Sequence, residues 1–120
     1  MTLIYKICAM TEWQKSIETG QYTGSPDDIR DGFIHLSTPD QLQGTADRHF
    51  SGKRDLVLVA VETERLGPAL RFEPSRGGAL FPHLYAPLPV AAAVAVTPLA
   101  TDRDGRLVLP VLSGKDGTAS

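Results

Sequence analysis

The chain has 120 residues, of which 42% are hydrophobic and 22% are charged, and its formal net charge is −2. This length suits one domain with its own hydrophobic core, and the composition is typical of a globular rather than a disordered protein. The slight acidic excess differs from the basic surface of nucleic-acid-binding proteins, so we expect no nucleic-acid partner. No apolar run approaches the roughly 20 residues that cross a bilayer, so we expect no membrane partner.

The chain has a single cysteine, Cys8, which excludes an internal disulfide and a cysteine-rich zinc site. Because Cys8 lies within the apolar segment 4–10, we expect a buried structural thiol rather than a reactive one. The N-terminus lacks a basic region followed by a long apolar region, the pattern of a signal peptide. We therefore expect a cytoplasmic protein, and the sequence leaves its oligomeric state open.

The first elements expected are a strand and a short helix. Residues 3–9 are apolar and rich in Ile and Tyr, which favours a strand. A capping-box pattern that begins at Thr11 predicts the start of a helix, which should end at Gly20. Trp13 and Ile17 are one helical turn apart, so both are expected to face the core.

The next segment is expected to be a loop followed by a short strand. Residues 21–31 are rich in Gly, Ser, Pro and Asp, which is typical of loops. In the strand predicted within 31–37, alternation places Phe33, His35 and Ser37 on the same face.

The clearest helix signal follows this strand. Thr38 begins a second capping-box pattern, and Pro39 occupies the first helical position, where proline is favoured. Leu42 and Ala46 recur at helical spacing, and Gly52 marks the end of the segment.

The second half of the chain predicts strands. The segment 56–61 is an almost continuous apolar and β-branched run, which indicates a central strand buried on both faces. Asp104-Gly105 is a hairpin signal. Further strands are expected at 69–73, 90–96 and 107–109, with an irregular segment at 74–87. Together these elements predict an α+β fold with a mainly antiparallel sheet of about six strands and two short helices, in a single domain of residues 1–112 with a flexible tail at 113–120.

Residues 70–87 concentrate groups that bind ligands or transfer protons, on a backbone rich in glycine and proline. Arg71 and Glu73 should share one face of a strand, either as a surface ion pair or as a polarised pair at a pocket wall, with Glu73 as a base. Arg76 stands beside Gly77-Gly78, which suits either a phosphate-binding loop or a plain turn.

Two further residues of this segment, His83 and Tyr85, should project to one face of an extended chain. The tyrosine ring suits stacking on a flat heterocycle, and the imidazole suits proton transfer; the alternative is a loop packed on the core. His35 raises the same choice between binding a ligand and bonding to a neighbouring carbonyl.

We expect no catalytic zinc site. The ligands available would be His35, His49 and His83 with Glu62 or Glu73. Because neither His-x-His nor His-Glu-x-x-His spacing is present, we expect no metal.

Several stretches of the chain, 31–38, 56–61, 70–73 and 77–89, closely resemble the DUF952 family of small bacterial proteins, a family without an established activity. The resemblance extends from about residue 3 to residue 96. That family is similar in fold to the ADP-ribosyltransferase superfamily, whose members bind NAD in the cleft of a split antiparallel sheet. The resemblance therefore implies a split, ADP-ribosyltransferase-like sheet.

One branch of that superfamily uses a strand histidine, a later tyrosine and a final glutamate. His35 matches the histidine, which by resemblance holds the ribose and the amide of NAD. Tyr85 matches the tyrosine that stacks on nicotinamide. No glutamate follows Tyr85 in this chain, and Glu73 precedes it, so the third position of the pattern is unmatched.

The leading hypothesis is a small protein with an NAD- or nucleotide-binding cleft that performs ADP-ribosyl transfer or NAD processing. Its catalytic residues would be His35, Glu73 and His83, and its ligand-binding residues would be His35, Ser37, Arg71, Arg76 and Tyr85. NAD would be a substrate, and no metal would take part. The alternative is a non-catalytic module that binds a small ligand or a partner. A third hypothesis is a metal-independent hydrolase or isomerase that uses His83 with Glu73.

Overall fold

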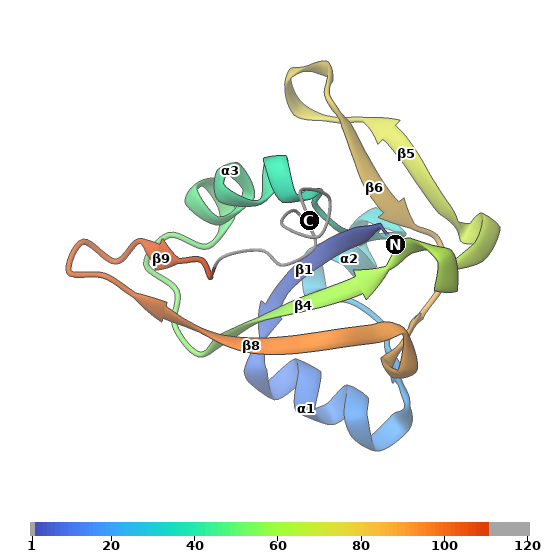
Figure 1. Ribbon diagram of the computed structural model, residues 1–120, viewed down its shortest axis with the longest axis horizontal. Helices are drawn as coiled ribbons and strands as arrows, with labels where there is room; N and C mark the ends of the chain where they lie inside the picture. Colours follow the sequence, from blue (N-terminus) through green and yellow to red (C-terminus); the bar gives the residue numbers. More distant parts are fainter. Residues whose placement is uncertain (1, 111–120) are drawn as a thin grey trace.

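The computed structural model describes residues 2–110, with the side chain of Arg76 excepted. This part of the chain contains nine strands, four of them only two residues long, and three α-helices. The strands are β1 (Leu3–Ala9), β2 (Gln21–Tyr22), β3 (Ile34–His35), β4 (Leu56–Glu62), β5 (Leu70–Pro74), β6 (Leu80–Leu84), β7 (Leu88–Pro89), β8 (Ala93–Thr101) and β9 (Leu107–Val108). The helices are α1 (Met10–Thr19), α2 (Pro26–Asp31) and α3 (Pro39–His49) (Figure 1).

The strands form two larger antiparallel sheets and one short pair. One sheet has the order β1-β4-β8-β9, the other has the order β3-β6-β5, and β2 pairs with β7. An isolated bridge joins the two sheets: Tyr5 N–H donates to the Ser37 carbonyl at 2.8 Å, and Ser37 N–H donates to the Tyr5 carbonyl at 2.9 Å. This bridge places β1 beside the residues that follow β3.

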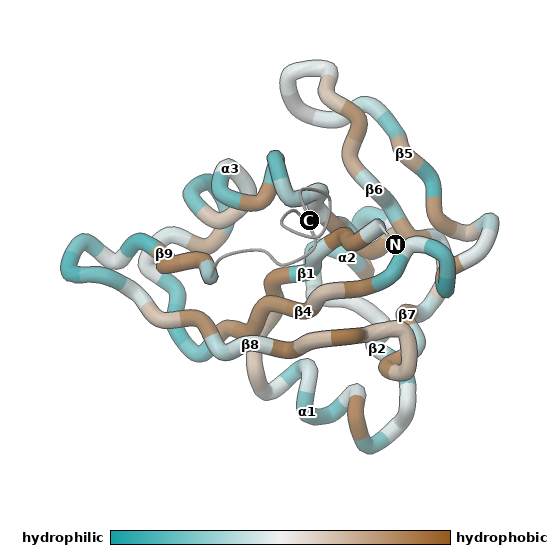
Figure 2. The backbone as a smooth tube through the Cα atoms, viewed as in Figure 1, coloured by the Kyte–Doolittle hydropathy of each residue, from teal (hydrophilic) through white to brown (hydrophobic). Residues whose placement is uncertain are grey.

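The central sheet carries a core on each face. Val57 and Val59 of β4 pack in the same cluster as Trp13 of α1, whereas Leu58 packs in the cluster that contains Leu42 of α3. Successive side chains of a strand point to opposite faces, so β4 is covered by a helix on either side. Figure 2 shows the resulting apolar character of β1 and β4. The prediction of a central strand buried on both faces is confirmed.

The segment predicted as a loop at 21–31 contains helix α2. Ser25 begins it: its side chain accepts from the backbone N–H of Asp28 at 3.2 Å, and Asp28 accepts from the backbone N–H of Ser25 at 2.9 Å. Pro26 occupies the first turn, and Gly32 ends the helix with a positive φ of 87°. The loop prediction was wrong because this capping box has aspartate at the third helical position. Its serine, proline and aspartate are residue types that are also typical of loops.

The irregular segment predicted at 74–87 contains strand β6. This strand is central to its sheet, although Pro82 within it has no N–H to donate. The carbonyl of Pro82 still accepts from the Leu36 N–H at 3.0 Å, which preserves contact with the chain after β3. Proline in a central strand is unusual, and this explains the error.

The two predicted helices both form, with two corrections in α1. Helix α1 begins at Met10 after an N-cap Ala9 that makes no side-chain cap, so the capping box at Thr11 was wrong. Its stop at Gly20 is confirmed, but Ile17 is 56% exposed and does not face the core. Helix α3 begins as predicted, with the Thr38 N–H donating to Gln41 Oε1 at 3.1 Å.

The remaining strand predictions differ in extent. Strand β8 starts at Ala93, later than the predicted start, and continues to Thr101, and the hairpin at Asp104-Gly105 joins it to β9. Strands β2, β6 and β7 were not predicted, and they raise the count from the six expected to nine. The tail predicted at 113–120 lies outside the described residues, and the domain bounds remain a prediction. Within residues 2–110, no helix combines the length and the apolar character needed to cross a membrane.

Cys8 is 2% exposed, as the sequence predicts, and burial raises the pKa of its thiol to about 12. An ordinary cysteine titrates about three pH units lower, so the reactive thiolate should be about 10³-fold scarcer in the folded protein. We expect a thiol reagent at pH 8 to label the folded protein far more slowly than the protein in denaturant, as followed by mass spectrometry. Equal labelling rates in the two states would contradict this burial.

Candidate functional site

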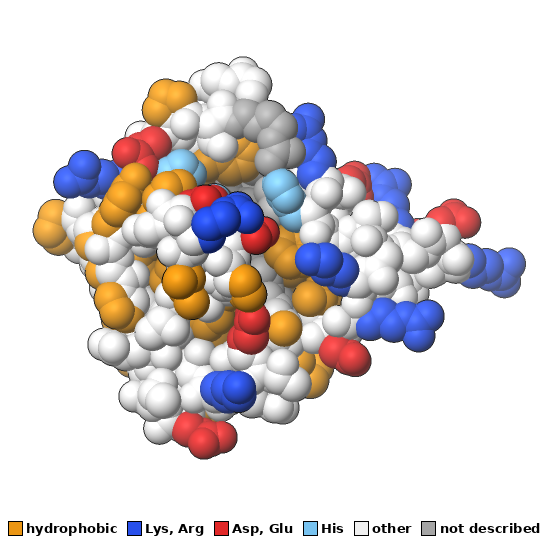
Figure 3. All heavy atoms as spheres, turned by 180° about the vertical axis from the view of Figure 1, so that it is seen from behind, with side chains coloured by type: hydrophobic (Ala, Val, Ile, Leu, Met, Phe, Trp, Pro, Cys, Tyr) orange, Lys and Arg blue, Asp and Glu red, His pale blue; other side chains and the backbone are white. Residues whose placement is uncertain are grey.

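A cavity of about 540 Å³ lies where the two sheets meet, and helices α2 and α3 close its sides. Its wall includes Lys6 from β1, His35 and His83 from the paired strands β3 and β6, and Arg48 from α3. Figure 3 shows a hollow on the back face of the molecule with histidine side chains beside it. The volume is within the range of small-molecule sites.

A buried ion pair forms the floor of this region. Lys6 Nζ lies 2.8 Å from Asp28 Oδ2, and the two side chains are 6% and 2% exposed. Lys6 also donates to the carbonyl of His35 at 3.0 Å. Asp28 accepts further hydrogen bonds from the backbone N–H groups of Ser25 and His35. Buried charges are tolerated when paired and hydrogen-bonded in this way, so the pair fixes α2 against β1 and β3.

The charge of Asp28 is maintained despite its burial. Burial by itself would raise the pKa of this carboxyl, but the hydrogen bond from His35 and the positive charge of Lys6 outweigh it. The pKa of Asp28 is therefore held well below its usual range. Asp28 is consequently a fixed anion beneath His35.

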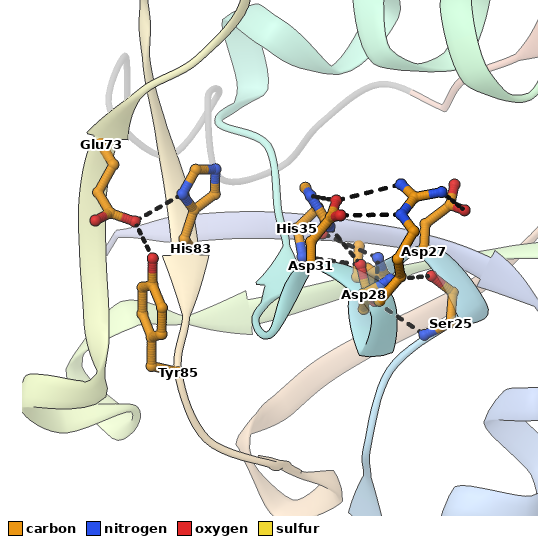
Figure 4. Close-up of polar contacts among 10 residues, drawn as sticks. Ser25, Asp27, Asp28, Asp31, His35, Glu73, His83 and Tyr85 are labelled. Atoms are coloured by element: carbon orange, nitrogen blue, oxygen red, sulfur yellow. Dashed lines mark hydrogen bonds and ion pairs between the residues drawn. The ribbon is translucent and has the colours of Figure 1, made fainter.

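His35 is held by two carboxylates. Its Nδ1 lies 2.6 Å from Asp28 Oδ1, and its Nε2 lies 3.1 Å from Asp31 Oδ2 (Figure 4). A neutral imidazole has only one N–H, so both nitrogens can donate to these oxygens only when the ring is protonated. The His35 side chain is 38% exposed, and that of Asp31 is 35% exposed. Both side chains are therefore partly accessible to solvent.

A second network holds His83. The Nδ1 of His83 lies 2.9 Å from Glu73 Oε1, and the Tyr85 hydroxyl donates to the same oxygen at 2.7 Å (Figure 4). The hydrogen bonds from Tyr85 and His83 lower the pKa of Glu73. When Nδ1 carries the proton that Glu73 accepts, Nε2 of His83 is a proton acceptor. His83 lines the cavity, but Glu73 and Tyr85 are not among the described residues that line it.

Phe33 connects the two networks. Its ring centroid lies 4.6 Å from that of His35, 4.1 Å from that of His83 and 5.2 Å from that of Tyr85. His35 and His83 face each other in the register of β3 and β6, with ring centroids 5.7 Å apart. The two imidazoles therefore belong to one site, packed against one aromatic ring.

The structure brings together most residues that the sequence singled out. Ser37 joins His35 and His83 in the cavity wall, where its hydroxyl lies 2.7 Å from the Thr45 hydroxyl. Arg71 lies over the Tyr85 ring, with 5.4 Å between its guanidinium carbon and the ring centroid. The side chain of Arg76 is not among those that the structure describes, so its predicted role in binding the ligand stays a prediction.

Lys6, Asp28 and Asp31 were missed by sequence reasoning. A lysine within the apolar run 3–9 is the signal for a buried, paired cation, because lysine is almost never fully buried unless it has a partner. The capping box that begins at Ser25 is the signal that Asp28 lies in the first turn of a helix rather than in a loop.

Within residues 2–110, no group of three or more His, Cys, Asp or Glu side chains is arranged to hold a metal ion. Several ionisable groups at the cavity instead pair with one another or with neighbouring carboxylates, in the two networks centred on His35 and His83. Proton transfer and hydrogen bonding are therefore the chemistry that this arrangement provides.

The family model described as "Protein of unknown function (DUF952)" matches residues 7–96, so the chain belongs to this family. The family prediction is confirmed. Among solved structures, the X-ray structure of protein CC0527 from Caulobacter crescentus is 47% identical and has a TM-score of 0.87, covering 99% of this chain and 100% of that one. The solution NMR structure of CC0527 is 51% identical over 88% of this chain and 91% of that one, with a TM-score of 0.79. No curated protein matched the chain.

Proposed function

We propose that the cavity binds NAD or a related nucleotide and that the protein performs ADP-ribosyl transfer or NAD processing there. One observation carries this proposal: two histidines from paired strands meet at a single cavity, and each is held by carboxylates that the other does not contact. The arrangement of two antiparallel sheets joined at Tyr5 and Ser37 supports a kinship with the split sheet of the ADP-ribosyltransferase superfamily.

In this proposal His83 is the proton acceptor. Glu73 holds its Nδ1, so Nε2 is oriented to accept a proton from a water or an acceptor hydroxyl. That oxygen bonds to the ribose C1′ as the bond from C1′ to the nicotinamide nitrogen breaks. The bonding electrons leave with nicotinamide, which becomes neutral, and the proton passes to His83. His35 would donate to a ribose hydroxyl or to the nicotinamide amide.

Calorimetric titration with NAD, ADP-ribose and nicotinamide tests the binding step. We expect heat of binding with NAD and ADP-ribose, and a weaker signal with nicotinamide because it offers fewer contacts. His35→Ala should weaken NAD binding, because it removes a donor from the cavity wall. If millimolar NAD and ADP-ribose give no heat with the folded protein, the proposal is wrong.

The second candidate is a non-catalytic module that binds the same class of ligand. No glutamate follows Tyr85 in the chain, and Oε1 of Glu73 already accepts two hydrogen bonds. Binding of NAD without release of nicotinamide would favour this candidate. Release that is abolished by His35→Ala would rule against it.

A further inference from the structure

Helix α3 presents one continuous face to the cavity. Gln41, Gly44, Thr45 and Arg48 all line it, and their spacing of three, four and seven residues places them on one side of a helix. Gln41 fixes this face against the second sheet, because its Nε2 donates to the carbonyl of Leu80.

The charges on the cavity wall are paired except at the ends of this face. Lys6 pairs with Asp28, and Arg30 pairs with Asp27 and Asp31. Within residues 2–110, Arg48 makes no ion pair.

Asp40 is the acidic residue at the other end of the face. It belongs to the first helical turn, where a carboxylate interacts favourably with the helix dipole. Asp40 and Arg48 are eight residues apart, which is about 12 Å along the helix axis. An acid at this distance leaves the positive charge of Arg48 available to an anion in the cavity.

Gly44 keeps the helix surface open next to Arg48. It lies in the helix interior, where glycine is unfavourable compared with most residues, and no positive φ at this position requires it. A Cβ added at Gly44 would meet no heavy atom within 4 Å, so close packing does not require it either. The surface of α3 is therefore open at this position.

We propose that this face of α3 is the anion subsite of the cavity, where Arg48 binds a phosphate or a carboxylate of the ligand against the open surface at Gly44. This inference rests on the proposed function and gives the ligand a defined orientation in the cavity. Its reacting end lies at His35 and His83, and its anionic part lies along α3. A guanidinium suits both anions because it can donate two parallel hydrogen bonds to either of them.

The probes are inorganic pyrophosphate and succinate, titrated into the labelled full-length protein and followed by two-dimensional NMR. For the anion that fits, we expect shifts concentrated at the amides of Gly44, Thr45 and Arg48. A response to pyrophosphate alone identifies a phosphate subsite, and a response to succinate alone identifies a carboxylate subsite. If neither anion at millimolar concentration shifts these amides, the inference is wrong.

Two substitutions sharpen the test. Arg48→Gln should weaken binding of the anion by roughly 10- to 100-fold, the effect of losing a charged hydrogen bond, whereas Arg54→Gln should not change it. Arg54 is a matched control because it is exposed and lies outside the cavity wall. Gly44→Met should leave the melting temperature unchanged or raised, since methionine favours helix, while blocking the anion. Unchanged binding in either Arg48→Gln or Gly44→Met would overturn the subsite.

Failure of the inference can be distinguished from failure of the proposed function. If NAD binds equally to the wild type and to Arg48→Gln, the subsite is wrong and the nucleotide proposal stands. If pyrophosphate binds at Gly44 and Arg48 but NAD and ADP-ribose do not bind, the subsite stands and the nucleotide proposal fails.

Discussion

Replacing Asp28 with alanine should lower the free energy of unfolding by about 3–5 kcal/mol, the loss expected when one partner of a buried ion pair is removed. The substitution leaves the ammonium group of Lys6 buried without a counter-charge, and it removes the acceptor for the N–H groups of Ser25 and His35. Urea denaturation followed by circular dichroism measures this change. A loss below about 1 kcal/mol would mean that the pair behaves like an exposed one.

Removing both charges separates the ion pair from the other roles of Asp28. The double variant Lys6→Met/Asp28→Asn should be more stable than the sum of its single variants predicts, because it has no unpaired buried charge. Strict additivity of the single losses would contradict an energetic coupling between Lys6 and Asp28.

The same ion pair gives a pH dependence of stability with a defined sign. The folded pKa of Asp28 is lowered, so the unfolded chain binds more protons in acid, and stability falls as pH falls. The contribution is fully present above the unfolded pKa of about 4 and is lost progressively below it. Asp28→Asn should therefore lose less stability than the wild type between pH 5 and pH 3. An identical slope in the two proteins would contradict this linkage.

The sequence predicted elements whose signals are local. The continuous apolar run of β4 and the capping box of α3 each lie within a few residues, and both are found in the structure. The Lys6–Asp28 pair joins residues 22 positions apart in two different elements, so no local pattern reveals it. Helix α2 was missed because the residue types at its start are also typical of a loop. The same error left Asp28 out of the predicted site residues.

In the network around His83, the sequence likewise predicted the local arrangement of each segment but not how the segments meet. Alternation predicted that Arg71 and Glu73 share a face and that His83 and Tyr85 share another. Their meeting depends on the register of β5 and β6, in which Arg71 lies opposite His83. Glu73 reaches His83 and Tyr85 from the next position on the same face, and Arg71 lies over the Tyr85 ring. Residue preferences for β-strands could not predict this pairing of β5 with β6, because Pro82 disfavours a central strand at β6.

The two networks give the cavity opposite kinds of hydrogen-bonding group. His35 lies between Asp28 and Asp31, whose two oxygens are hydrogen-bond acceptors, so its ring is a hydrogen-bond donor here. His83 has one carboxylate, at Nδ1, and when Nδ1 donates to it, Nε2 is the acceptor. A site with a donor imidazole beside an acceptor imidazole can bind the leaving group and take a proton from the nucleophile in the same step.

In the proposed reaction, replacing His83 with alanine should lower nicotinamide release from NAD by about 10²- to 10⁴-fold, the usual contribution of a general base. Glu73→Gln should lower kcat with little change in KM, because Glu73 orients His83 from outside the cavity wall. Tyr85→Phe is the matched control: it removes the other hydrogen bond to Glu73 and should have a smaller effect. Chromatographic assay of nicotinamide measures the rates, and denaturation curves show which variants remain folded. A folded His83→Ala variant with the wild-type rate would exclude His83 as the base.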